Sequence, residues 1–232
     1  MTGRAVPAFD PARYPGPRPD GPTLVHDGRV HPLHLDHAAP HLRAAVDAPV
    51  LAGEVRRWVV AYGANASPGR LVDKGLDRRG AVLLPAVVTD HVPAFESRRT
   101  VYGSVPLTLV RQEGARTATW VLGVHVDDTD VLDRSEGRAI GSYRLGHVGV
   151  VAVADRFVLD DALAYLPGPD TVLQRDAAGG WRTWPQLAQA DASAHLDAAG
   201  PAVPAPTPSR TVAGDWPVAT LRRRPPPVAQ GS

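Results

Sequence analysis

Short apolar runs bounded by turn residues recur along the chain and predict a β-rich fold. Residues 58–62 form a continuous apolar run that ends at Gly63, which is typical of a strand buried on both faces. Residues 23–33 predict a hairpin that turns at Asp27-Gly28. Further strands are predicted over residues 81–96, 104–112, 119–126, 143–153 and 156–166.

Helix signals are fewer and shorter. Ser67-Pro68 is typical of a helix start, with Ser at the N-cap and Pro at the first helical position. Gly75 is expected to end that helix. Apolar spacing and turn residues predict the other helices over residues 38–52, 129–135 and 184–199.

The order of these elements indicates the fold class. The strands are not separated by regular long helices, which argues against a doubly wound parallel sheet. We therefore predict an α+β fold with a small, curled, mixed or antiparallel sheet or barrel and a few flanking helices. The expected parts are an N-terminal extension with a hairpin and a helix, partly disordered (1–55), a core (56–168), a C-terminal helical segment (169–200) and a Pro-rich disordered tail (201–232).

Composition excludes several classes of function. The formal net charge of +1 gives no basic surface for nucleic acid. The chain contains no Cys, so disulfides, thiolate catalysis and Cys-based zinc sites are excluded. No apolar run approaches the length of a membrane span, and the N-terminus has no apolar h-region of a signal peptide. We expect a cytoplasmic protein that binds neither a membrane nor nucleic acid.

Two segments carry residue types that suggest chemistry. The expected strand–helix turn over residues 62–65 reads Tyr-Gly-Ala-Asn, and residues 132–137 read Leu-Asp-Arg-Ser-Glu-Gly, followed by Tyr143. A carboxylate such as Glu136 can take a proton from an ammonium group. Backbone N–H groups near a helix start can hold a carboxylate or a developing oxyanion, and Asn65 adds a side-chain donor.

Together these segments resemble the γ-glutamylcyclotransferase-like family. That family has a Tyr-Gly-Ser-Asn turn after its first strand, then a Leu-Asp-x-x-Glu-Gly segment and a Tyr that opens the next strand. The resemblance covers about residues 57–166. The sequence departs from the family at Ala64, where Ser is usual, and in its N-terminal extension.

The resemblance implies an enzyme that uses no metal and no organic cofactor. The substrate, a γ-glutamyl amine or γ-glutamyl amino acid, would attack its own γ-carbonyl with its α-amine and release 5-oxoproline. Glu136 would be the general acid/base. The substrate-binding residues implied by the family are Tyr62, Gly63, Ala64, Asn65 and Tyr143. The leaving amine and the oligomeric state stay open.

Each of these residues also has a simpler interpretation. Glu136 could lie on a solvated helix end, and residues 62–65 could form an ordinary turn. Tyr62 and Tyr143 could be core aromatics with local hydroxyl partners. Arg70 could bind a substrate carboxylate, although a solvated face is the commoner place for such a residue. A non-catalytic module that binds a small anion is therefore the alternative.

Two further features suggest binding but have simpler explanations. Five His residues lie between His26 and His41, but no clear helical frame orients them as metal ligands, so we expect an exposed, His-rich cap. Residues 222–227 read Arg-Arg-Arg-Pro-Pro-Pro and could bind a partner in an extended conformation, although a solvated tail is expected. Partner binding through the two ends of the chain is thus a third hypothesis.

Overall fold

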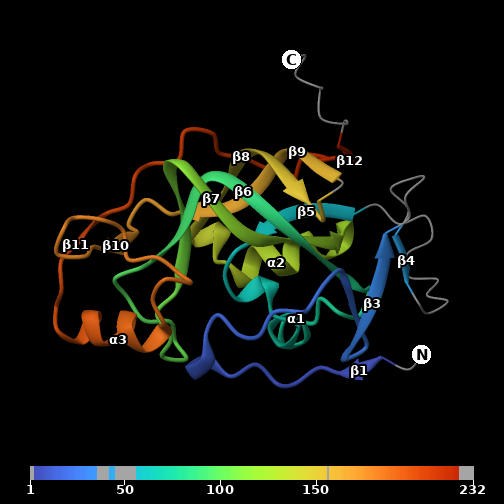
Figure 1. Cartoon of the computed structure of the whole chain (residues 1–232), viewed down its shortest axis with the longest axis horizontal. Coiled ribbons are helices and arrows are strands. Elements are labelled where there is room, and N and C mark those ends of the chain that lie inside the picture. The colour runs from blue at the N-terminus through green and yellow to red at the C-terminus, as the bar shows by residue number, and fades with distance from the viewer. Residues whose placement is uncertain (1–2, 36–41, 45–55, 156, 225–232) are drawn as a thin grey trace, which may run out of the picture.

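A computed structural model of the chain describes residues 3–35, 42–44, 56–155 and 157–224 (Figure 1). The helices are α1 (Pro68–Asp73), α2 (Thr129–Ser135) and α3 (Gln189–Asp197). The strands are β1 (Arg4–Ala5), β2 (Thr23–His26), β3 (Arg29–Leu35), β4 (Leu42–Ala44), β5 (Arg56–Ala61), β6 (Ala81–Phe95), β7 (Leu107–His125), β8 (Tyr143–Val153), β9 (Phe157–Pro167), β10 (Val172–Gln174), β11 (Ala202–Pro204) and β12 (Leu221–Arg223).

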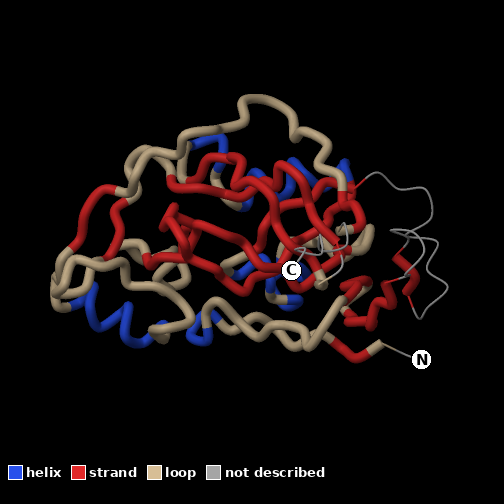
Figure 2. The backbone as a smooth tube through the Cα atoms, turned by 45° about the horizontal axis from the view of Figure 1, so that its top comes forward, coloured by secondary structure: helices blue, strands red, loops and turns tan. Residues whose placement is uncertain are grey.

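Within these residues, five strands close into a barrel. β6 pairs antiparallel with β7, β7 with β5, and β9 with β8, while β5 and β9 pair in parallel. The ring closes where Ala86 and Val87 of β6 pair with Val153 and Ala152 of β8. The predicted α+β fold with a mixed, curled barrel is therefore confirmed, and Figure 2 shows the strands gathered at the centre of the molecule.

The barrel wall is buried on both faces where the helices cover it. Val60 of β5 packs in one apolar cluster, whereas its neighbours Val59 and Ala61 pack in another. That second cluster includes Leu71 of α1 and Leu132 of α2. This burial on both faces explains the continuous apolar run of β5.

β7 is a single strand of 19 residues, where the sequence suggested separate strands over 104–112 and 119–126. Its pairing with β6 runs from Leu107 to Gly123, with one irregularity opposite Thr89 and His91. The middle of β7 is exposed. A strand in that environment lacks the apolar pattern that indicates burial, which explains why two strands were predicted.

The helix predictions agree with the structure in part. α1 and α2 begin and end close to the predicted positions, and Gly75 after α1 has a φ of 71°. The C-terminal helix begins only at Gln189, because the Trp184 N–H donates to the carbonyl of Pro93 in β6 and holds the preceding residues outside the helix. None of the helices in the described ranges has the length and apolar character needed to cross a membrane.

The N-terminal extension is built into the sheet. The hairpin turns at the predicted Asp27-Gly28, and β2 pairs with β6. The predicted helix over 38–52 is contradicted at residues 42–44, which form β4 because they pair with β3. The rest of that range lies outside the described residues. Residues 3–22 were expected to be loosely ordered, yet Tyr14 in this segment is buried in the core.

Residues 201–224 also differ from the expected disordered tail. β11 pairs with β10, and β12 pairs with β9 of the barrel. Trp216 is 6% exposed, its ring centroid lies 6.0 Å from that of Tyr165, and its Nε1 donates to Asp133. A Pro-rich segment forms few regular hydrogen bonds, but short pairings and one buried indole are enough to order this one.

We expect Trp216→Ala to lower the free energy of unfolding by about 3–5 kcal/mol, the usual cost of deleting a large aromatic side chain from a core. Val218→Ala in the same segment is the control, because Val218 is 68% exposed and its truncation should change stability by no more than about 0.5 kcal/mol. Urea unfolding of both variants measures this. Equally small effects would show that the segment does not pack on the barrel.

Candidate active site

A cavity of about 360 Å³ lies at the end of β5, between α1 and α2. Its wall includes the turn after β5, the C-terminal end of α2 and the segment that precedes β7. The structure brings all the site residues predicted from the sequence to this cavity: Tyr62, Gly63, Ala64, Asn65, Glu136 and Tyr143. The five tyrosines of the chain, all of them described, line it as well.

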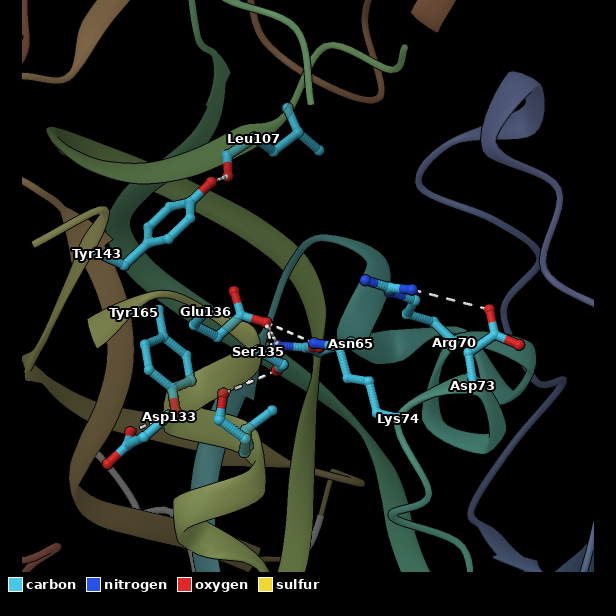
Figure 3. Close-up of polar contacts among 11 residues, drawn as sticks. Asn65, Arg70, Asp73, Lys74, Leu107, Asp133, Ser135, Glu136, Tyr143 and Tyr165 are labelled. Atoms are coloured by element: carbon cyan, nitrogen blue, oxygen red, sulfur yellow. Dashed lines mark hydrogen bonds and ion pairs between the residues drawn. The ribbon is translucent and has the colours of Figure 1, made fainter. Parts of the chain in front are cut away.

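Glu136 lies at the end of α2 with its carboxylate directed into the cavity, and its side chain is 16% exposed. Its Oε1 accepts hydrogen bonds from Asn65 Nδ2 at 3.2 Å and from Lys74 Nζ at 2.5 Å. Its Oε2 has no hydrogen-bond partner within the described ranges of the chain. Figure 3 shows this second oxygen on the side towards Tyr143. One oxygen is thus anchored and the other is available to a ligand.

Lys74 is a site residue that the sequence patterns did not reveal. Its Nζ lies 2.5 Å from Asn65 Oδ1 and 2.5 Å from Glu136 Oε1, and its side chain is 6% exposed. Burial lowers the pKa of Lys74, while the charge of Glu136 and the hydrogen bond to it oppose that effect. One signal was present: Lys74 is the only Lys in a chain with 24 Arg residues.

The turn after β5 presents backbone donors. Residues 64–66 form a short 3-10 helix, and N–H groups at the start of a helix have no acceptor within it. Neither Ala64 N nor Asn65 N donates to another part of the described chain. Both residues line the cavity. The expected amide donors and the carboxylate of Glu136 therefore face the same space.

Arg18 of the N-terminal extension binds this turn through two of its backbone carbonyls. Its guanidinium donates to the carbonyl of Gly63 at 2.8 Å and to that of Tyr62 at 3.1 Å. It also lies 5.0 Å above the ring of Trp184. Because the two carbonyls are fixed, the orientation of the peptide groups in the turn is fixed with them. Nothing in the sequence around Arg18 indicated this role.

The hydroxyl groups of the predicted tyrosines are already occupied. Tyr62 Oη donates to the carbonyl of Tyr165 at 2.5 Å. Tyr143 Oη lies 2.6 Å from Glu96 Oε1 and 3.0 Å from the carbonyl of Leu107. Burial raises the pKa of both phenols well above the usual value. Tyr62 and Tyr143 are therefore core aromatics that contribute ring surface to the cavity wall.

Glu96 is a second carboxylate near the cavity that the sequence did not single out. Its side chain is fully buried, and its Oε2 accepts from Arg98 Nε at 2.6 Å. Burial raises the pKa of Glu96, against the opposing charge of Arg98 and the hydrogen bond from Tyr143. Glu96 and Tyr143 thus form a polar network behind the wall formed by the Tyr143 ring.

Arginine side chains, among them those of Arg70 and Arg134, line the cavity. Arg70 lies over the rings of Phe9 and Tyr102, at 5.6 and 5.2 Å from their centroids, and 3.8 Å from Asp73. Arg134 makes no ion pair with any residue in the described ranges. The positive charge of these lining residues favours an anionic ligand.

The described part of the chain contains no group of three or more His, Asp or Glu side chains that could hold a metal ion. His26 lies in β2, and His31 and His34 lie in β3. His37 and His41 lie outside the described residues.

No protein-family model matches the sequence, and no match to a curated protein was found. Solved structures similar to this chain include YkqA from Bacillus subtilis (TM-score 0.40, 19% identity, covering 48% of this chain and 40% of YkqA). They also include an uncharacterised protein from Homo sapiens (TM-score 0.42, 18% identity, covering 52% of this chain and 73% of that protein). A third is a gamma-glutamyl cyclotransferase (TM-score 0.42, 15% identity, covering 62% of this chain and 80% of that protein). At these values, the function has to be argued from the site itself.

The raised pKa of Glu96 predicts a pH dependence of stability. Below the usual pKa of 4.5, the carboxyl is protonated in both states; above it, the unfolded chain releases a proton that the folded state retains. The free energy of unfolding of the wild type should therefore fall relative to that of Glu96→Gln as pH rises from 4.5 to the folded-state pKa of Glu96. The expected slope is about 1.4 kcal/mol for each pH unit between the two pKa values. Urea unfolding between pH 4 and pH 8 measures this, with the exposed Glu113→Gln as control. A constant difference would contradict the burial effect.

Proposed function

We propose that this chain is a γ-glutamylcyclotransferase-like enzyme that releases 5-oxoproline from a γ-glutamyl amine or γ-glutamyl amino acid. The observation that carries the proposal is the carboxylate of Glu136, anchored through Oε1 while Oε2 faces a cavity lined by amide donors. The motifs over residues 62–65 and 132–137 support the same activity by resemblance. A cytoplasmic location belongs to this proposal.

The charges of the cavity suit a γ-glutamyl headgroup, which carries one carboxylate and one ammonium. The carboxylate fits the N–H groups of Ala64 and Asn65, and the arginine side chains of the cavity wall favour its approach. The ammonium fits Glu136 Oε2, the oxygen without a partner in the described part of the protein. A substrate bound in this way has its amine next to the base that must deprotonate it.

The reaction needs no nucleophile from the protein. Glu136 takes a proton from the substrate ammonium, and the resulting amine attacks the γ-carbonyl carbon. A new C–N bond closes the five-membered ring while the carbonyl oxygen becomes an oxyanion, which backbone N–H donors stabilise. The oxyanion collapses and the original amide C–N bond breaks as Glu136 returns its proton to the departing nitrogen. The ring nitrogen then gives its extra proton to the regenerated Glu136 carboxylate, which releases it to solvent. The products are 5-oxoproline and the free amine.

Lys74 acts in this proposal as a positioning residue. Its ammonium contacts Glu136 Oε1 and Asn65 Oδ1 together, so it fixes the carboxylate relative to the turn. It also balances the charge of the carboxylate, since both side chains are mostly withdrawn from solvent. Holding a base within hydrogen-bond reach of its proton is a large part of what such a site contributes to the rate.

A non-catalytic module for a small anion is the second candidate. The cationic residues of the cavity wall favour it: Arg70, Lys74, Arg98 and Arg134. Glu136 argues against it, since a carboxylate aimed into the cavity weakens the binding of a simple anion. Turnover distinguishes the two candidates, because a binding module would form no 5-oxoproline.

We expect the purified chain to release 5-oxoproline from at least one member of a panel of γ-glutamyl amines and γ-glutamyl amino acids. Glu136→Gln should lose activity by roughly a hundredfold or more, since its amide keeps the shape of the side chain but cannot accept the proton. Chromatographic detection of 5-oxoproline measures both proteins. Equal activity in wild type and variant would contradict the assignment of the base.

A further inference from the structure

The N-terminal extension carries one tyrosine into the cavity. Figure 1 shows the first segment of the chain running past α1, and Tyr14 of this segment is 7% exposed and lines the cavity. Its Oη accepts a hydrogen bond from the N–H of Leu107 at 3.1 Å. It also lies next to the turn after β5, because a Cβ placed on Gly63 would meet Tyr14 Oη at 3.0 Å.

The Tyr14 hydroxyl differs from the other tyrosine hydroxyls of the cavity. Tyr62 and Tyr165 donate to protein oxygens, and the hydroxyl of Tyr143 lies between two of them. Tyr102 is 38% exposed, so solvent reaches its side chain. The Tyr14 hydroxyl accepts from Leu107, and its own proton has no acceptor anywhere in the described ranges. A buried donor without an acceptor is costly, so its position at the cavity indicates a ligand oxygen.

We propose that the Tyr14 hydroxyl donates a hydrogen bond to an oxygen of the bound glutamyl headgroup, which makes Tyr14 a further substrate-binding residue. The inference rests on the function proposed above and identifies a contact from outside the two sequence motifs. It also bears on Ala64, where the resembling family has Ser: a hydroxyl absent from the turn is supplied beside it by the N-terminal extension.

Two features of the structure prepare Tyr14 for this role. Burial, together with the negative charges of Glu136 and Glu96, raises the pKa of the Tyr14 phenol far above its usual value, against the hydrogen bond from Leu107. The phenol therefore stays protonated and remains a donor near neutral pH. Arg18, four residues further along the same segment, binds the carbonyls of Tyr62 and Gly63 and so holds the segment against the turn.

Tyr14→Phe tests the proposal, because it removes the hydroxyl and keeps the ring. We expect kcat/KM for the preferred γ-glutamyl substrate to fall roughly 10- to 100-fold, the usual effect of losing a hydrogen bond to a charged or developing anionic oxygen. Thr23→Val is the matched control: it also loses a buried hydroxyl, but one that donates to the carbonyl of Gly21 at 2.7 Å, away from the residues that line the cavity. The control should lower the thermal unfolding midpoint and leave kcat/KM within about twofold, as expected for a hydroxyl used only by the protein.

Ala64→Ser in the Tyr14→Phe background adds a second readout, since a hydroxyl restored in the turn should recover part of the lost kcat/KM. If the wild type turns over substrate and Tyr14→Phe has the same kcat/KM, the role of Tyr14 is overturned and the proposed function stands. If the wild type is inactive, calorimetric titration with L-glutamate tests the contact alone, with roughly tenfold weaker binding expected for Tyr14→Phe. A wild type that neither turns over the panel nor binds L-glutamate overturns both.

Discussion

Lys74 at the end of α1 and Glu136 at the end of α2 lie 62 positions apart in the chain, and the contact between their side chains joins the two helices. Both side chains are mostly withdrawn from solvent, and the desolvation of two charges is repaid only where their geometry is good and other hydrogen bonds complete it. Asn65 completes it, because its amide contacts both partners. The relative placement of α1, α2 and the turn after β5 therefore depends on this pair.

The barrel and the N-terminal extension position the turn after β5 relative to the pair of Lys74 and Glu136. β5 delivers the turn to the cavity, the apolar faces of α1 and α2 pack on the barrel wall, and Arg18 fixes the turn from its other side. The result is a carboxylate with one bound oxygen and one available oxygen, opposite backbone donors. Lys74 and Asn65 hold the carboxylate through Oε1 only, so they position the base and leave Oε2 available for the proton transfer.

The sequence predicts the parts of this structure that have local causes. The strand β5 follows from a continuous apolar run, and the turn and Glu136 follow from motif residues. Lys74 and Glu96 were not predicted, because their burial comes from partners distant in sequence; that Lys74 is the only Lys of the chain marks the residue but says nothing of its contacts. Residues 3–22 and 201–224 lack periodicity, and contacts of single side chains, such as those of Tyr14 and Trp216, order them.

A crystal structure of the chain with bound 5-oxoproline would show whether Glu136 Oε2 faces the nitrogen that takes part in the cyclisation. We expect the lactam nitrogen to lie within about 2.6–3.2 Å of Glu136 Oε2, with the carboxylate of the ligand at the N–H groups of Ala64 and Asn65. The contact between Lys74 and Glu136 Oε1 should persist. A ligand bound outside this cavity, or a Glu136 carboxylate turned into solvent while the ligand is bound, would contradict the role of Glu136 as the base.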